Sequence, residues 1–432
     1  MTGLSIGIDF GTTNTVVALA GAQGPAHLVK FPAPEREVFA FRSALSFYAP
    51  PDQPKEREVE AGPWAIEAYV EDPLETRFIQ SFKSFAASES FTETQIIGRR
   101  YQFEDLLSAF LLKLRDHAGA DLAELPKRVI VGRPVTFAGG APNESLALSR
   151  YETGFKRLGF EEILYAYEPV GAAFFFAREL TEDATVLVGD FGGGTSDFSI
   201  IRFTREDGEI RSTPLGRAGV GVAGDAFDYR ILDNLVSPEL GKGSSYTSFG
   251  KVLPIPNRYY STFARWDQLA LMRASRDMRE IRKLVKEAVE PEKIESLVEV
   301  LDENYGYRLY RSVSDVKETL SAQGEALFRF EAGSIDIARQ VERAEFEAWI
   351  APELQLIETA VDAALADAGL APEGIDRVFL TGGSSLVPAV RDIFYRRFEA
   401  GKIESGAELE SIASGLALMG RERDLTKWAR GA

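Results

Sequence analysis

The feature that most constrains the fold is a hairpin motif that occurs twice in the chain. The triplet Asp-Phe-Gly stands at residues 9–11 and again at 190–192, each time between segments rich in β-branched residues. Such segments on both sides of a turn rich in Gly and Thr predict a strand, a tight turn and a second strand. A purely structural turn has no reason to repeat its Asp. The two copies lie 181 residues apart and therefore predict an internal duplication with two similar lobes.

Both turns also have the composition of a phosphate site. Residues 11–14 read Gly-Thr-Thr-Asn, and residues 192–195 read Gly-Gly-Gly-Thr. Consecutive backbone N–H groups in such a turn form a concave anion site, and glycine allows a phosphate to approach the backbone closely. An Asp at the end of a strand can hold Mg²⁺, usually through water molecules. Two such hairpins facing one another would grip a triphosphate from both sides.

Missing motifs exclude two common classes of ATP-binding protein. The Asp-Phe-Gly triplets are not accompanied by the His-Arg-Asp catalytic loop or the glycine-rich loop of a protein kinase. A Walker A loop, with Gly-Lys-Ser/Thr at a helix start, is also missing.

The composition excludes several further chemistries. The chain has no Cys and only two His, so disulfides, thiolate metal sites, imidazole zinc sites and a Ser-His-Asp hydrolase are not expected. A net charge of −17 argues against binding to nucleic acid or to anionic membranes. There is no signal-peptide pattern at the N-terminus and no apolar run near the ~20 residues of a membrane helix. We therefore expect a cytoplasmic protein.

Four motifs in order give the chain a family resemblance. They lie at residues 8–14, 167–173 (Tyr-Glu-Pro-Val-Gly-Ala-Ala), 190–197 and 381–384 (Thr-Gly-Gly-Ser). The set resembles the signature of the actin/hexokinase/heat-shock ATPase superfamily. In detail it resembles the ATPase domain of the seventy-kilodalton heat-shock (DnaK-type) family, particularly its divergent, truncated YegD-like members. The resemblance spans roughly 1–230 and 312–420. It implies an α/β fold with two duplicated ribonuclease-H-like lobes, inserted subdomains and a central nucleotide cleft.

The resemblance also implies a division into domains. Lobe I is expected at 1–180 with an inserted subdomain at about 35–103, and lobe II at 181–380 with an insertion at about 229–311. Residues 381–432 would form a closing segment with a Gly-Gly loop and a C-terminal helix that packs back toward lobe I. No peptide-binding domain is expected, since the last dozen residues resemble neither the apolar linker nor the β-sandwich of DnaK-type chaperones.

The insertion in lobe II contains a strongly charged segment. We expect residues 262–289 to form one long helix. Its basic residues suggest a binding face, but interleaved acids such as Asp277 and Glu280 favour a solvated helix.

The catalytic roles that the resemblance implies fall on a few charged side chains. Asp9 and Asp190 would hold hydrated Mg²⁺, with Asp190 also counted as catalytic. Lys83 resembles the family's catalytic lysine, which stabilises charge on the γ-phosphoryl group, although the family's Arg-Leu-Ile-Gly-Arg pattern is absent directly after it. Glu168 would position or activate the attacking water, and Thr195 would meet the phosphates. Pro134 resembles the strand-end proline of the family's relay between lobes, or is a simple strand terminator.

The nucleotide-binding set that the resemblance implies extends from the phosphates to the adenosine. Lys317 and Ser321 are spaced i,i+4, so they share one helix face and can reach one ligand. Two positions depart from the family pattern, since Ser314 stands where a Glu is usual and Ala223 where a Gly is usual. The full set is Gly11, Thr12, Thr13, Asn14, Gly192, Gly193, Gly194, Thr195, Gly224, Asp225, Lys317, Ser321, Gly382, Gly383 and Ser384.

These residues support three functional hypotheses. The first is a heat-shock-like switch that binds ATP or ADP with Mg²⁺ and hydrolyses ATP slowly. The second is a small-molecule kinase on the same fold, for which the strand end at 132–134 offers no clear Asp base. The third is an actin-like filament protein. The expected partners are a nucleotide and an unknown protein client or co-chaperone, with no nucleic acid and no membrane.

Overall fold

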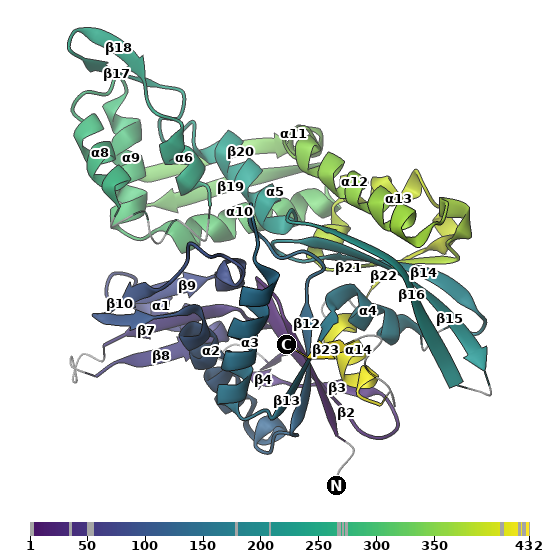
Figure 1. The fold of residues 1–432 in the computed structure, drawn as a ribbon. Helices are drawn as coiled ribbons and strands as arrows, with labels where there is room; N and C mark the ends of the chain where they lie inside the picture. Colours follow the sequence, from purple (N-terminus) through teal and green to yellow (C-terminus); the bar gives the residue numbers. More distant parts are fainter. Residues whose placement is uncertain are drawn as a thin grey trace. The chain divides into compact units, whose positions relative to one another are not determined.

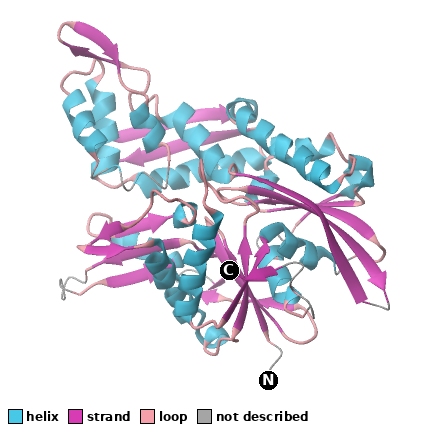
Figure 2. Ribbon diagram, viewed as in Figure 1, coloured by secondary structure: helices cyan, strands magenta, loops and turns pink. Residues whose placement is uncertain are grey.

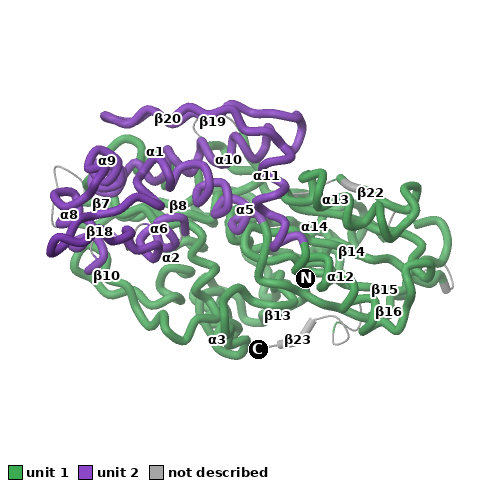
Figure 3. The backbone as a smooth tube through the Cα atoms, turned by 90° about the horizontal axis from the view of Figure 1, so that it is seen from above, with its two compact units in different colours: residues 1–223, 355–432 green, residues 224–354 purple. Residues whose placement is uncertain are grey.

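The computed structural model describes most of the chain, in two compact units. The described residues are 4–33, 37–49, 56–177, 180–206, 209–265, 269, 272, 275–406, 410–421, 425 and 429–431. Residues 1–223 with 355–432 form the first unit, and residues 224–354 form the second (Figure 3). The lobe boundaries expected from the sequence stay predictions.

The first unit is built on two sheets with the same topology (Figures 1 and 2). In each sheet, the first three strands in chain order pair as antiparallel neighbours. Two later strands extend the sheet on the free side of the first strand and run parallel to it. The first sheet has the order β3(Ala26–Leu28)-β2(Asn14–Ala20)-β1(Ser5–Phe10)-β12(Arg128–Arg133)-β13(Glu162–Tyr167), and β23(Ala429–Gly431) pairs with β13. The second sheet has the order β16(Glu209–Val220)-β15(Ser196–Glu206)-β14(Ala184–Phe191)-β21(Arg377–Thr381)-β22(Ile403–Ser405). The predicted duplication and α/β fold are therefore confirmed.

The two predicted hairpins have the same local geometry. The N–H of Gly11 donates to the carbonyl oxygen of Asn14 (3.0 Å), and the N–H of Gly192 donates to that of Thr195 (2.9 Å). A four-residue turn thus joins β1 to β2 and β14 to β15, and the shared register places each Asp one residue before the end of its strand. Both entering strands are central in their sheets, which explains their continuous apolar sequences.

Helices cover both sheets and fill the spaces between them with aromatic side chains. α2(Phe103–Ala118) and α3(Glu144–Leu158) contribute to the core over the first sheet, where Phe10 packs against Phe82, Phe110 and Tyr151 at ring distances of 5.5–5.8 Å. On the second sheet, Phe191 packs on Phe394 of α13(Pro388–Tyr395). Such ring pairs account for much of the high Phe content. Other helices among the described residues of this unit are α1(Gly62–Glu71), α12(Ala351–Ala368), which belongs to this unit from Gln355 on, and the short η2(Gly119–Leu122), η5(Pro372–Gly374) and η7(Ala400–Lys402).

Between β3 and α2 the chain adds small sheets to the first unit. β7(Ala44–Tyr48) lies between β8(Glu58–Ala61) and β9(Arg77–Gln80), and the short helix η1(Phe82–Phe85) follows β9. The shorter pairs are β4(Phe31–Pro32) with β5(Glu37–Val38), β6(Phe41–Arg42) with β2, and β10(Thr94–Ile96) with β11(Arg99–Tyr101).

Two helices connect the sheets of the first unit by crossing one another. α4(Glu168–Phe176) follows the last strand of the first sheet and contacts β14 and β15 of the second. α14(Ser411–Met419) follows the last strand of the second sheet and contacts β1 and β2 of the first (Figure 1). The helices approach so closely that a methyl group at Gly415 would overlap the carbonyl oxygen of Gly171. Glycine is needed at this crossing because no side chain fits between the two backbones.

The second unit combines short helices with two hairpins. Its elements among the described residues are α5(Gly224–Ile231), the π-helix η4(Leu232–Val236), β17(Ser245–Ser248), β18(Lys251–Pro254), α6(Arg258–Phe263), α8(Arg276–Leu284), α9(Pro291–Asp302), α10(Gly306–Ala322), β19(Glu325–Ala332), β20(Ile335–Glu342) and α11(Arg343–Trp349). α10 packs on β19, and α8 packs on α9. Within the described ranges, no helix combines the length and apolar character that a membrane span requires.

The prediction of one helix over 262–289 is wrong. α6 ends at Phe263, and α8 begins after Ser275, whose backbone is extended and whose hydroxyl accepts a hydrogen bond from the N–H of Met278. Ser275 is therefore an N-cap, a role that helical periodicity of charge does not exclude. Residues 266–268, 270, 271, 273 and 274 of this range lie outside the described residues.

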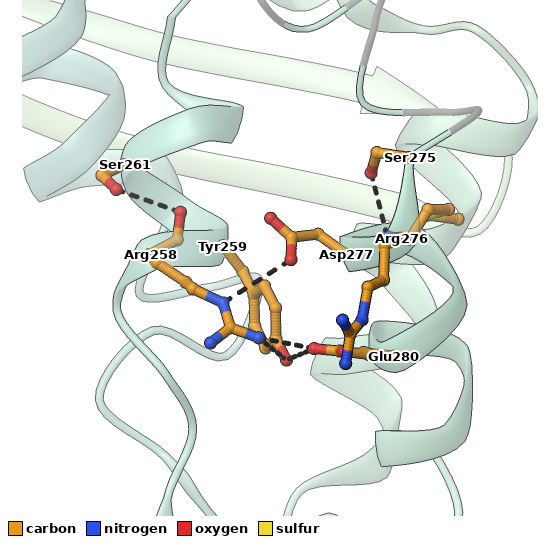
Figure 4. Close-up of polar contacts among 8 residues, drawn as sticks. Arg258, Tyr259, Ser261, Ser275, Arg276, Asp277 and Glu280 are labelled. Atoms are coloured by element: carbon orange, nitrogen blue, oxygen red, sulfur yellow. Dashed lines mark hydrogen bonds and ion pairs between the residues drawn. The ribbon is translucent and has the colours of Figure 1, made fainter.

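The charges of this region pair with one another, as the interleaved acids predict. Arg276 donates to Glu280 (2.9 Å), and Glu280 also accepts hydrogen bonds from Arg258 and Tyr259 (Figure 4). Arg282 pairs with Asp302 of α9 (2.6 Å). These contacts favour a solvated, internally paired face.

The helix crossing generates a stability prediction. We expect Gly415→Ala to lower the melting temperature by roughly 5 °C or more, because the added methyl group forces α4 and α14 apart. Gly140→Ala is the matched control, since a methyl group there meets no atom within 4 Å. Thermal unfolding followed by circular dichroism measures both, and equal melting temperatures for the two variants would contradict the prediction.

Candidate functional site

The predicted lysine and glutamate form a buried ion pair in the first unit. Lys83 lies on η1, Glu168 is the first residue of α4, and the Nζ and Oε1 atoms are 2.7 Å apart. Both residues are less than 10% exposed. Burial opposes the charge of Lys83, but Glu168, Tyr151 and Asp9 together raise the pKa of its ammonium above the ordinary value. The lysine is therefore held in its charged form.

Local sequence explains how these two side chains are positioned. Glu168 follows Tyr167, whose extended backbone begins α4, and Pro169 occupies the first helical turn where no N–H donor is needed. β12 leaves room for the glutamate, since a methyl group at Gly132 would lie 3.1 Å from its Cγ. η1 begins after Ser81, a non-glycine residue with a φ of 54°.

Three aspartates share the surroundings of this pair. Asp9 lies near the end of β1, Asp190 occupies the same position in β14, and Asp197 lies opposite Asp190 on β15. Burial and the charge of Glu168 raise the pKa of Asp9 to about 7, partly offset by Lys83. Burial, Glu168 and Asp9 raise the pKa of Asp190 well above its usual range. Several carboxylates thus compete for one buried ammonium.

This arrangement fits a hydrated divalent cation. A cation of charge +2 would relieve the repulsion between Asp9 and Asp190, which come from equivalent positions of the two hairpins. Among the described residues no group of three or more side chains is placed to coordinate a metal directly. Two carboxylates without a third ligand suit Mg²⁺, which keeps several of its water molecules when bound.

The two turns predicted to bind phosphate lie next to each other. A methyl group at Gly194 would be 3.5 Å from the hydroxyl oxygen of Thr12, so the turns at 11–14 and 192–195 approach closely. Ser43 supports the first turn, because its N–H donates to Thr13 and its hydroxyl donates to the carbonyl of Gly11. The predicted group from the two hairpins is therefore brought together around Asp9 and Asp190.

The Gly-Gly loop lies against the second hairpin. Gly382 follows β21 with a φ of +84°, and a methyl group on it would overlap the carbonyl oxygen of Phe191. A residue other than glycine would be strained here and would also clash. Gly383 begins the short helix η6(Gly383–Leu386), and Ser384 on it is buried.

The predicted adenosine residues belong to the second unit and meet there. Lys317 of α10 pairs with Asp228 of α5 (2.7 Å) and donates to the carbonyl of Gly224 (3.4 Å). Although burial opposes it, Asp228 raises the pKa of Lys317. The hydroxyl of Ser321 donates to the backbone carbonyl of Lys317 one turn earlier on α10. Of the two predicted side chains, Lys317 is the one whose contacts reach the start of α5, which carries Asp225.

Two residues of this arrangement were not singled out from the sequence. Asp197 accepts hydrogen bonds from the N–H groups of Val135 (2.7 Å) and Thr136 (3.2 Å), the two residues after Pro134. Burial and Glu168 raise the pKa of Asp197 to about 7, against these hydrogen bonds and one from Thr195. Asp228 was missed although it lies one helical turn after Gly224, a spacing that places both on one face.

Two comparisons with known proteins agree with each other. A family model described as Hsp70 protein matches residues 76–244 and 277–421, more than half of the chain. Two proteins named Chaperone protein DnaK, from two strains of Thermus thermophilus, are 26% identical to the chain over 437 aligned residues. These alignments cover 98% of this chain and 62% of each relative, so the chain spans about three fifths of the length of those chaperones.

The crowded carboxylates generate a prediction for the protein without nucleotide or metal. Asp190→Asn removes one buried like charge and should raise the melting temperature in EDTA by roughly 2 °C or more, since the raised pKa of Asp190 marks its ionised form as unfavourable. Asp121→Asn, at an exposed position of η2, should have little effect. Differential scanning fluorimetry compares the two, and a lower melting temperature for Asp190→Asn would refute the electrostatic interpretation.

The buried pair of the second unit generates another prediction. Lys317→Met should cost roughly 3 kcal/mol or more in unfolding free energy, because it leaves the carboxylate of Asp228 buried without its cation. Adding Asp228→Asn should restore part of this loss. Urea unfolding measures both variants, with Lys242→Met, which breaks the more exposed pair with Asp233, as a control of smaller cost. A double variant no more stable than Lys317→Met would contradict the assignment.

Proposed function

Because the chain belongs to the Hsp70 family, we propose that it is a chaperone-type ATPase that binds ATP with Mg²⁺ and hydrolyses it slowly. The observation that carries the proposal is the buried ion pair between Lys83 and Glu168, placed beside two aspartates from equivalent positions of a duplicated hairpin. Structural ion pairs alone do not explain a surplus of buried carboxylates, which instead suits a site that receives a cation.

The aspartates and the turns bind different parts of the complex of nucleotide and metal. Asp9 and Asp190 hold hydrated Mg²⁺, and the metal supplies neutralisation of the phosphate charges. Backbone N–H groups of the turns at 11–14 and 192–195, with the hydroxyls of Thr12, Thr13 and Thr195, contact the phosphates. The glycines of these turns and of the loop at 382–384 let the nucleotide lie against the backbone.

Lys83 and Glu168 act on the reacting groups. The ammonium of Lys83 stabilises negative charge that develops on the γ-phosphoryl group. The carboxylate of Glu168 orients a water molecule for in-line attack and accepts its proton. The same carboxylate accepts a charge-assisted hydrogen bond from Lys83, which fixes its orientation beside the lysine.

Chaperone activity is part of this proposal. The relatives named Chaperone protein DnaK are longer proteins, and the alignment with this chain covers 62% of each. A nucleotide-dependent change between two states, read by a protein client or co-chaperone, is the consequence we propose for slow hydrolysis. No contact of the described residues favours the small-molecule kinase or the filament protein over this function.

Glu168→Gln tests the proposed function. It should lower phosphate release from ATP by roughly 100-fold while the Kd for ATP changes by less than about threefold, because the amide keeps the size of the side chain but cannot accept the proton. Glu60→Gln is the matched control, since Glu60 also pairs with a lysine (Lys113, 3.2 Å) within the first unit. Purified wild type, Glu168→Gln and Glu60→Gln are compared by nucleotide titration with Mg²⁺ and by phosphate release. Absence of ATP binding by the wild type would refute the proposal.

A further inference from the structure

The segment that follows Lys83 is held by a neighbouring helix rather than by its own secondary structure. Between η1, which ends at Phe85, and β10, which begins at Thr94, the described residues form turns without a helix or strand. η1 itself has four residues and follows Ser81 in the left-handed region. A non-glycine residue keeps that conformation only where its surroundings impose it. The position of Lys83 therefore depends on contacts from elsewhere.

One guanidinium supplies most of these contacts. Nη1 of Arg150, on α3, donates to the carbonyl oxygens of Phe85 (3.0 Å), Ala86 (2.8 Å) and Ser88 (3.2 Å). Nη2 donates to the carbonyl of Phe91 (2.6 Å). Arg150 is only 9% exposed, and its guanidinium also lies 5.7 Å from the centre of the Phe103 ring. A planar fork with five N–H donors can bind several carbonyls at once, which an ammonium cannot do in the same geometry.

The first turn of α3 holds the same segment at two further points. The N–H of Asn143 donates to the carbonyl of Ala87 (2.9 Å), and its Nδ2 donates to Glu89 (2.7 Å). Asn143 is at the same time the N-cap of α3, because its Oδ1 accepts from the N–H of Leu146 (3.0 Å). Cap and guanidinium thus attach residues 85–91 to one rigid helix, two turns apart.

We propose that Arg150 is a positioning residue for Lys83. By fixing the carbonyl groups of residues 85–91, it holds η1 so that Nζ of Lys83 stays at 2.7 Å from Glu168. Arg150 acts on the reaction only through Lys83. The catalytic consequence rests on the proposed ATPase function, whereas the ordering of the segment does not.

The kinetic test separates positioning from general damage to the fold. Arg150→Met should lower the single-turnover rate of ATP hydrolysis about 10-fold or more with the Kd for ATP changed less than about threefold, because misplacement of a catalytic group affects the chemical step. Arg150→Lys, which keeps the charge, should recover only part of the rate. Arg115→Met, which removes similar bonds to the carbonyls of Leu122 and Ala123, should behave as wild type.

A double variant identifies the residue through which Arg150 acts. Arg150→Met combined with Lys83→Met should be no slower than Lys83→Met alone, since the lysine is then absent whether or not its segment is held. Multiplied losses in the double variant, or a wild-type rate for Arg150→Met, would overturn the inference. If Arg150→Met does not fold, the same comparison is made with Arg150→Lys.

Hydrogen exchange decides the inference independently of turnover. The amides of Ala86, Ser88 and Phe91 donate within the segment, and Arg150→Met should increase their exchange about 10-fold or more, with Arg115→Met unchanged. A wild type that binds ATP but releases no phosphate would refute the proposed hydrolysis and leave this measurement to decide on Arg150. Unchanged exchange in both Arg150 variants would refute the positioning role.

Discussion

Buried like charges are the constraint on which the first unit depends. Asp190 and Glu168 are buried, Asp9 beside them is half-buried, and one ammonium, that of Lys83, is bonded to the glutamate at 2.7 Å. The raised pKa values of Asp9 and Asp190 mean that their ionised forms are less favourable in the folded chain than in water. These two groups therefore reduce stability as the pH rises above the ordinary pKa of an aspartate, and the cost is complete above the raised pKa. The fold has to hold them together against their repulsion. Under the proposed function, binding of Mg²⁺ with a nucleotide would stabilise the folded state by mass action.

Close packing between two helix backbones resists movement of the sheets that carry these carboxylates. α4 and α14 cross at Gly171 and Gly415 with no side chain between them, and each helix follows one sheet while packing on the other. Since Glu168 is the first residue of α4, the helix that joins the sheets also carries the glutamate that we propose as catalytic. A relative movement of the sheets would therefore displace Glu168, and this couples the geometry of the site to that of the crossing.

The parts of the site that follow local motifs could be predicted from the sequence. The hairpins at 9–14 and 190–195 repeat a pattern, so the fold, the pair of aspartates and the adjoining turns were expected before the structure. Contacts between distant segments left no such pattern. Asp197 binds the N–H groups of Val135 and Thr136, and Arg150 binds carbonyl oxygens, which every residue type has. Ser275 is the N-cap of α8 and therefore interrupts the long helix predicted over residues 262–289. The sequence does not distinguish a capping serine from a serine inside a helix, because the two differ only in backbone conformation.

The segment after Lys83 shows why a departure from a family pattern does not by itself exclude a role. The family's Arg-Leu-Ile-Gly-Arg pattern is absent there, which left the identity of the lysine open from sequence alone. Yet Lys83 reaches Glu168, and the carbonyls that follow it are bound by a guanidinium from α3. Because a carbonyl can be bound by a donor from any nearby element, the residue that holds a catalytic group in place can belong to different elements of a fold. Residues that contact the reacting groups can therefore be predicted from sequence motifs, whereas residues that position those groups can be identified only from the structure.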